Sequence, residues 1–198
     1  GVDVVVEGGQ TMNPSTEDIL NAVESLNAET IYILPNNKNI ILAAEQASKI
    51  VENKKVIVIP TKTIPQGITA MISLSEERSA EENVENAIEE ITNVKTAQIT
   101  YAVRNTTIDD VEIHENDVMA LGDNGIIGVD KSIDSAVEKA LNSMIDDTSE
   151  LVCLYYGDEV NEDDATRLCD ELSAKYKNVE FELHNGGQPV YYYFISVE

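Results

Sequence analysis

The sequence has no tryptophan, and its 198 residues include only two phenylalanines, two histidines and two cysteines. Cys153 lies in a strand-like run and Cys169 in a helical pattern, so we expect two buried thiols rather than a disulfide framework. No apolar run approaches the roughly 20 residues of a membrane-spanning helix, and the first apolar segment lacks the basic flank of a signal peptide. We therefore expect a cytoplasmic chain with no membrane insertion.

Basic side chains are scarce. Lysine and arginine number 13 against 37 acidic residues, which gives a formal net charge of -24 at pH 7. A field of this sign repels nucleic acid, anionic lipid surfaces and free polyphosphate. The charge predicts neutral or basic protein partners and no nucleic acid.

The sequence also lacks the common catalytic motifs. It contains no Cys-x5-Arg phosphatase loop, no Gly-x-Ser-x-Gly elbow and no Gly-x4-Gly-Lys-Ser/Thr phosphate loop. His114 lies in a polar stretch, where a surface histidine is expected. The acidic groups at 109–110, 146–147 and 162–164 do not have calcium-loop spacing and are expected to be solvated. The sequence therefore predicts no catalytic residue and no metal site.

Hydrophobic periodicity divides the chain near Asn93. Short apolar runs alternate with helical patterns before this point, which predicts a parallel sheet covered by helices. The predicted strands are 4–6, 31–34 and 56–59, and the predicted helices are 16–26, 39–51, 67–73 and 81–91.

The second part opens on an alternating run at 96–103 and mixes hairpins with helices. Residues 122–125, GDNG, have the composition of a hairpin turn, and Asn161 is positioned to cap a helix. The predicted strands are 96–103, 118–121, 179–183, 191–197 and one at Cys153, and the predicted helices are 133–145 and 162–176. The fold class is thus α/β, with a parallel βαβ subdomain at 1–94 and a mixed-sheet subdomain at 95–198, which we expect to pack across a cleft.

Three loops at the carboxyl ends of the predicted first strands, 7–15, 35–39 and 60–67, are rich in amides and hydroxyls. Open α/β sheets bind ligands at this edge. An alternative is that these residues only satisfy turns and helix caps, as Ser15 with Asp18 would in a capping box. The candidates for a ligand or partner cleft are Gln10, Thr11, Asn13, Ser15, Asn36, Asn37, Thr61, Thr63 and Gln66.

A glycine turn near the start, GGQT at 8–11, is echoed by GGQP at 186–189. If the two halves meet at a cleft, both turns would face one ligand or partner, which adds His184 and Gln188 to the candidates. The alternatives are a coincidence between two turns and, for His184, an ordinary position at the end of a strand.

Four ordered motifs resemble one family: GGQTMNPSTED at 8–18, LPNNKN at 34–39, PTKTIPQG at 60–67, and GGQP with its tyrosine-rich strand. The chain resembles, over essentially its whole length, the C-terminal domain of the dihydroxyacetone-kinase-like, ATP-binding subunit of bacterial fatty acid kinase. That domain is similar to DegV-type fatty-acid-binding proteins.

The resemblance implies a division of labour within lipid metabolism and phospholipid synthesis. A separate N-terminal domain would bind Mg-ATP, so no cofactor is expected in this chain. The C-terminal domain would dock a fatty-acid-binding carrier subunit of DegV type, whose fatty acid receives the phosphate on its carboxylate. The expected partners are therefore this carrier and the remainder of the kinase chain.

DegV-type proteins also supply a rival function, because their Thr/Ser-rich first loop and a later glycine loop grip a lipid carboxylate. Positions broadly similar to those are occupied by Thr11, Ser15, Thr61, Thr63 and His184. Amide side chains crowd the same edge at Gln10, Asn13 and Gln66. We therefore expect a non-catalytic interaction domain, with direct binding of a fatty acid or other lipid as the alternative and a free-standing phosphatase or hydrolase as a third.

Overall fold

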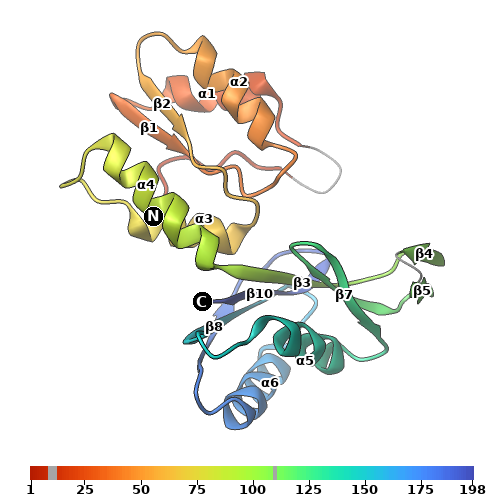
Figure 1. Ribbon diagram of the computed structural model, residues 1–198. Helices are drawn as coiled ribbons and strands as arrows, with labels where there is room; N and C mark the ends of the chain where they lie inside the picture. Colours follow the sequence, from red (N-terminus) through yellow and green to blue (C-terminus); the bar gives the residue numbers. More distant parts are fainter. Residues whose placement is uncertain (9–12, 109–110) are drawn as a thin grey trace. The chain divides into compact units, whose positions relative to one another are not determined.

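The computed structural model describes residues 1–8, 13–108 and 111–198. The chain divides into two compact units, Gly1–Asn93 and Val94–Glu198, called unit 1 and unit 2 below (Figure 1). In the described part of the chain, no helix is both long enough and apolar enough to cross a membrane.

Unit 1 is built around a βαβ arrangement. Strands β1 and β2 pair in parallel, with Ile31 opposite Val56. Lys54, just before β2, donates from its Nζ to the carbonyl oxygens of Val23 and Leu26 at 2.9 and 2.5 Å, and so caps the end of α1. The elements are α1 (Thr16–Ser25), β1 (Thr30–Ile33), α2 (Ile41–Ile50), β2 (Lys55–Val58), α3 (Ile64–Ser73) and α4 (Ala80–Asn93). The predicted parallel βαβ arrangement is confirmed.

The alternation of side chains along the two strands gives unit 1 three layers. Ile31 and Ile33 pack in one cluster with side chains of α1 and α2, whereas Tyr32 and Leu34 pack in another with α3 and α4. The helix pairs lie on opposite sides of the strands (Figure 1). Both faces of β2 are covered as well, which explains why residues 56–59 form a continuous apolar run.

Residues 4–6, predicted as a strand, are not one. Val4, Val5 and Val6 are 41%, 71% and 37% exposed, and they line a cavity beside α1 instead of pairing with β1. The prediction rested on three consecutive valines. Composition of this kind favours an extended chain but does not supply the neighbouring strand that a ladder requires.

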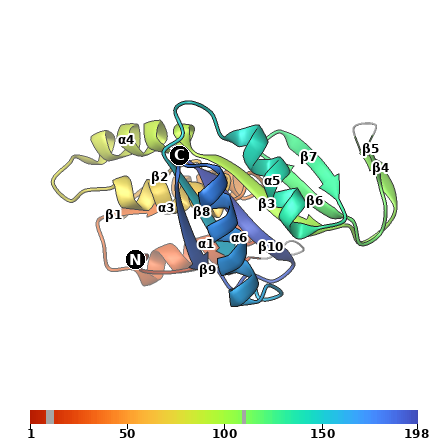
Figure 2. The ribbon, with the colours of Figure 1, turned by 90° about the horizontal axis from the view of Figure 1, so that it is seen from below.

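Unit 2 is a mixed six-stranded sheet of order β7-β6-β3-β10-β8-β9, with only β8 and β9 parallel among its pairs. Helices α5 and α6 cover one face of it, and the core lies between them and the sheet (Figure 2). The elements are β3 (Lys95–Tyr101), β4 (Thr106–Ile108), β5 (Val111–Ile113), β6 (Val118–Gly122), β7 (Gly125–Asp130), α5 (Ile133–Met144), β8 (Leu151–Tyr156), α6 (Glu162–Lys175), β9 (Glu180–Asn185) and β10 (Tyr191–Val197).

Local signals set much of unit 2. Gly125 has φ 128°, a conformation that favours glycine, and it closes the predicted hairpin between β6 and β7. The side chain of Asn161 accepts from Asp163 N at 2.8 Å, so the predicted cap of α6 is confirmed. The small β4–β5 ribbon was not predicted, because its strands have three residues each and carry little periodicity.

Candidate functional site

The carboxyl edge of the β1–β2 sheet brings two predicted site residues together. Asn36 N donates to Thr61 Oγ1 at 3.0 Å, and Thr61 Oγ1 donates to Asn36 Oδ1 at 2.9 Å. Thr61 is fully buried, and Asn36 has a left-handed φ of 55°, which asparagine tolerates better than most residues. The pair ties the loop after β1 to the loop after β2.

The neighbouring candidates make the hydrogen bonds of caps and turns. Ser15 forms a capping box with Asp18 at the start of α1, and Thr63 caps α3 by accepting from Gln66 N at 3.4 Å. Gln66 Oε1 accepts from Lys62 N at 2.8 Å, and Asn37 Oδ1 accepts from Asn39 N at 2.9 Å. The loops are thus held in one conformation mainly by their own polar side chains.

The other candidates of this edge are placed less closely. Asn13 lines a cavity of about 510 Å³ between residues 4–7 and α1, together with Pro14 and Asn21. Gln10 and Thr11 lie outside the described residues.

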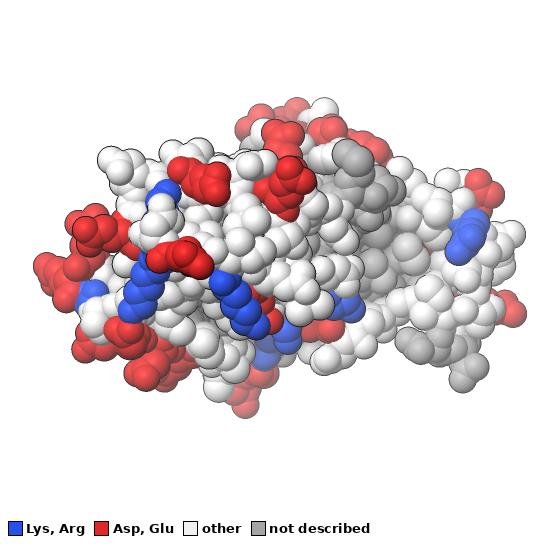
Figure 3. Space-filling view, turned by 90° about the horizontal axis from the view of Figure 1, so that it is seen from above, with Lys and Arg blue, Asp and Glu red and all other residues white. Residues whose placement is uncertain are grey.

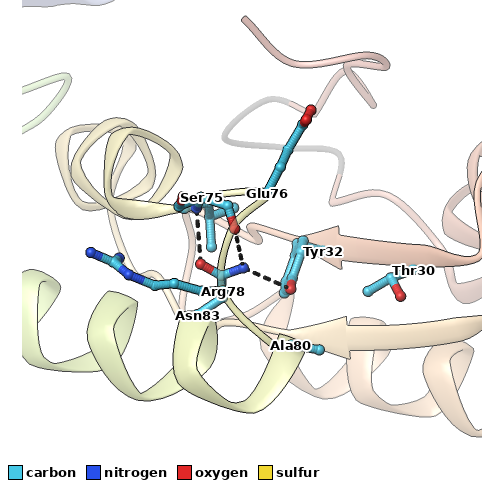
Figure 4. Close-up of a pocket in the computed structure, with 8 residues that line it drawn as sticks. Thr30, Tyr32, Ser75, Glu76, Arg78, Ala80 and Asn83 are labelled. Carbon is cyan, nitrogen blue, oxygen red and sulfur yellow. Dashed lines mark hydrogen bonds between the residues drawn. The ribbon is translucent and has the colours of Figure 1, made fainter.

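A second cavity of unit 1, about 290 Å³, opens between β1 and the α3–α4 connection. Asn83 is one of the residues that line it and is 4% exposed. It accepts from Ser75 N at 2.9 Å and donates to Ser75 O at 2.8 Å and to the Tyr32 hydroxyl at 3.4 Å (Figure 4). Arg78, which also lines this cavity, donates to Ser73 O at 2.9 Å. These bonds close the α3–α4 connection and bring no acid–base pair together.

Asn83 was missed at the sequence level although a signal existed. Asn83, Ala87 and Ile91 recur every fourth residue and form the buried stripe of α4. A polar residue in such a stripe must find internal partners, which predicts a buried hydrogen-bond centre.

The carboxyl edge of unit 1 differs from the rest of the chain in charge. Residues 30–44 and 53–75 contain no aspartate or glutamate, although the chain has 37 of them. Leu42 in the first turn of α2 is 64% exposed, and Ile64 in the first turn of α3 is 47% exposed. Figure 3 shows uncharged surface between clusters of acidic side chains. These two segments can be covered by a partner without desolvating carboxylates of their own.

In unit 2 the two remaining candidates lie next to the β8–β9 pair. The His184 ring stacks on Tyr155 with 5.1 Å between ring centroids and 24° between planes. Gln188 Nε2 donates to Tyr155 O at 2.8 Å, and Gly186 N donates to Tyr156 O at 2.9 Å. The GGQP segment therefore fastens the end of β9 to β8 and fixes the surroundings of His184.

Two further residues, absent from the sequence-level candidates, join His184. Glu182 Oε2 lies 2.9 Å from His184 Nε2 and 3.9 Å from Cys153 Sγ, and the three ligand atoms lie within 4.8 Å of one another. Burial raises the pKa of the Cys153 thiol. The spacing of Glu182 and His184 along a strand places both on one face, but the position of Cys153 opposite Glu182 depends on the register of two strands far apart in sequence.

Comparison with known proteins places the chain in a family. The family model for the C-terminal domain of FakA-like fatty acid kinase proteins matches residues 1–198. Protein YloV of Bacillus subtilis is 46% identical over 198 residues, and an uncharacterized protein of Staphylococcus aureus strain MRSA252 is 41% identical over the same length. The chain spans 36% of the length of each of these relatives.

Solved structures share the fold at low sequence identity. The Streptococcus pneumoniae Fatty Acid Kinase B3 protein, loaded with linoleic acid, superimposes with a TM-score of 0.66 at 13% identity, covering 93% of this chain and 76% of that one. The dihydroxyacetone kinase of C. freundii superimposes with a TM-score of 0.60 at 13% identity, and the match covers 94% of this chain and 41% of the kinase. DegV of Bacillus subtilis, a fatty acid binding protein, superimposes with a TM-score of 0.61 at 16% identity, and the match covers 94% of this chain and 77% of DegV. The resemblance seen in the sequence is thus confirmed, and the chain belongs to the family of FakA-like fatty acid kinase C-terminal domains.

Proposed function

We propose that this chain is a non-catalytic docking domain of a fatty acid kinase ATP-binding subunit. It binds a DegV-type carrier protein that holds the fatty acid, and a separate kinase domain of the same subunit, carrying Mg-ATP, phosphorylates the fatty acid carboxylate to an acyl phosphate. Membership of the family over residues 1–198 carries the proposal. The relatives are almost three times as long as the part that matches, which leaves room for a separate kinase domain.

The carboxyl edge of unit 1 supports docking rather than chemistry. Its described hydroxyls and amides hold the loops in shape, as the Asn36–Thr61 pair does, and Leu42 and Ile64 beside them are exposed. Exposed apolar side chains flanked by hydrogen-bonding groups are typical of the centre of a protein interface. The acid-free segments also avoid the cost of burying carboxylates under a partner.

Two measurements test the docking function. Isothermal titration of the 198-residue chain with a purified DegV-type fatty-acid-binding protein from the same organism is expected to show one-to-one binding. Acyl phosphate formation is expected from the full-length subunit with that carrier and Mg-ATP, but not from the chain alone. Absence of binding to every such carrier of the organism, or acyl phosphate formation by the chain alone, would contradict the proposal.

Direct lipid binding is the second candidate, because the fold is shared with a protein solved with linoleic acid. Native mass spectrometry of the chain after bacterial expression separates the two. Bare protein supports the docking function. A stoichiometric mass increment equal to a fatty acid would favour lipid binding by the chain itself, because a buried apolar ligand survives purification in a well-formed cavity.

A further inference from the structure

Three side chains with metal-ligating atoms meet on the sheet of unit 2. Cys153 of β8 and Glu182 of β9 are directly opposite each other in the parallel register, and His184 follows Glu182 by two residues on the same strand. Because side chains alternate along a strand, all three lie on one face of the sheet. We propose that Cys153, Glu182 and His184 form a zinc site.

The separations fit a small tetrahedral ion after modest side-chain movement. With a Zn–S distance of about 2.3 Å and Zn–N and Zn–O distances of about 2.0–2.2 Å, tetrahedral ligand atoms lie roughly 3.3–3.6 Å apart. The observed 2.9 Å from Glu182 Oε2 to His184 Nε2 and 3.9 Å from Glu182 Oε2 to Cys153 Sγ lie on either side of that range, and the ligand atoms of Cys153 and His184 lie within 4.8 Å of each other. The side chains of Glu182 and His184 are 47% and 45% exposed, so the Glu182 carboxylate has room to adjust.

The donor set selects the class of ion. Calcium and magnesium prefer cages made of oxygen, whereas a thiolate with an imidazole and a carboxylate suits zinc. Binding deprotonates the Cys153 thiol and releases the proton to solvent, while His184 binds as the neutral ring. Three protein ligands leave the fourth position for water or for a group from another molecule.

The surroundings hold the His184 ring in place. The His184 ring is stacked on Tyr155, and the backbone oxygen of Tyr155 is held by Gln188. This contact limits the rotation of the imidazole before any ion arrives. Metal-binding histidines are usually oriented by such neighbours.

A buried hydroxyl lies beside the Cys153 thiol. Ser196 of β10 is opposite Cys153 in the antiparallel register and is 1% exposed, and its hydroxyl interacts with the Cys153 thiol. A metal-bound thiolate at Cys153 would accept a hydrogen bond from the Ser196 hydroxyl, which would support this ligand without binding the ion itself.

The plainer interpretation is that Glu182 and His184 form an exposed ion pair above an inert thiol. The two interpretations differ in whether sulfur and imidazole bind one ion. Cobalt(II) distinguishes them, because a tetrahedral site with a thiolate gives a sulfur-to-cobalt charge-transfer absorption band that a histidine–carboxylate pair does not.

The chain supplies matched controls, since it has two cysteines and two histidines. The 198-residue chain, stripped with chelator, is titrated with cobalt(II) and then with zinc, and each variant is compared with wild type. We expect one cobalt per chain with a thiolate band, displaced by zinc. H184Q and E182Q should lower the affinity more than about tenfold, and C153A should abolish the band. C169S and H114Q, which change the other cysteine and histidine, should leave the cobalt affinity and the thiolate band unchanged.

His184 and Glu182 are half-exposed, so their variants are expected to remain folded, and a thermal melt of each variant without metal verifies this. Absence of a thiolate band in wild type would overturn the zinc site. Equal loss of affinity in H114Q and H184Q, or full affinity in H184Q, would show an adventitious ion instead.

Discussion

Thr61 and Asn36 are 25 residues apart in sequence and exchange two hydrogen bonds through one buried hydroxyl. Thr61 Oγ1 accepts from the backbone of Asn36 and donates to its side chain. A single hydroxyl therefore joins the loops that follow β1 and β2. Gly67 lies against the same amide, since a Cβ at that position would come within 2.0 Å of Asn36 Oδ1.

The first prediction concerns this hydroxyl. T61V keeps the shape of the side chain but leaves the backbone N–H and the side-chain Oδ1 of Asn36 without their partner, and we expect a loss of about 1–3 kcal/mol in the free energy of unfolding. T61S keeps the hydroxyl and loses one methyl group, so it should lose less. Urea unfolding of wild type, T61S and T61V measures the order of their free energies of unfolding. If T61S is as unstable as T61V, packing of the methyl group matters and the hydrogen bonds do not.

The second prediction concerns the backbone of Val190, which has φ 72°, a left-handed conformation that is unfavourable for a β-branched residue. V190A and V190G both remove the isopropyl group, so their difference isolates the backbone. Alanine is normally the more stabilising of the two, by roughly 0.5–1 kcal/mol in regular elements. At position 190 we expect glycine to be the more stable by about 1 kcal/mol. Thermal unfolding of V190A and V190G measures this difference. A higher melting temperature for V190A than for V190G would mean that the backbone at position 190 is not strained.

The third prediction concerns acid stability. Asp117 is 3% exposed, and its carboxylate pairs with Lys131 and accepts from His114 N at 2.9 Å. The Lys131 ammonium first, and the backbone N–H second, hold the pKa of this carboxyl below its ordinary value. The unfolded chain therefore binds the proton more readily, and the stabilisation is present above about pH 4 and is lost as the pH falls through the folded pKa.

We expect D117N to lose stability relative to wild type at pH 6 but to approach wild type as the pH is lowered below 4. D147N, at an exposed aspartate of the same unit, serves as the control, and its difference from wild type should stay small throughout. The measurement is thermal unfolding between pH 2.5 and 6. If the difference in melting temperature between D117N and wild type does not change with pH, this carboxylate has no role in acid unfolding.

The sequence predicted elements better than it predicted contacts. The strands predicted at 31–34 and 56–59 occur one residue earlier, at Thr30–Ile33 and Lys55–Val58. They were found because apolar runs and helical periods are local properties, and Asn161 was recognised as a cap from its position before a helix. Residues 4–6 share the same composition without a neighbouring strand. The Asn36–Thr61 pair and the meeting of Cys153 with Glu182 depend on which strands pair and in what register, which a single sequence does not contain.

The last prediction locates the docking surface. Helices α2 and α3 each carry an exposed apolar residue in the first turn, Leu42 and Ile64, and another at the C-terminal end, Ile50 and Ile72. The first turns follow the carboxyl ends of β1 and β2, so Leu42 and Ile64 belong to the edge formed by the Asn36 and Thr61 loops, whereas the helix ends lie toward the opposite edge. The double variant I50A/I72A therefore removes the same kind of exposed surface from the same helices and serves as the matched control.

If the carrier covers the carboxyl edge, Leu42 and Ile64 become buried in the complex, and each is worth about 1.5–3 kcal/mol when fully buried. We expect L42A/I64A to weaken carrier binding at least about tenfold, mainly through faster dissociation. I50A/I72A should bind like wild type. All four side chains are exposed, at 64%, 47%, 58% and 73% for Leu42, Ile64, Ile50 and Ile72, so neither variant should alter the melting temperature by much. Titration calorimetry of both variants against the same carrier gives the comparison. Wild-type affinity in L42A/I64A with a loss in I50A/I72A would place the interface at the opposite edge and leave the Asn36–Thr61 loops as structural connections.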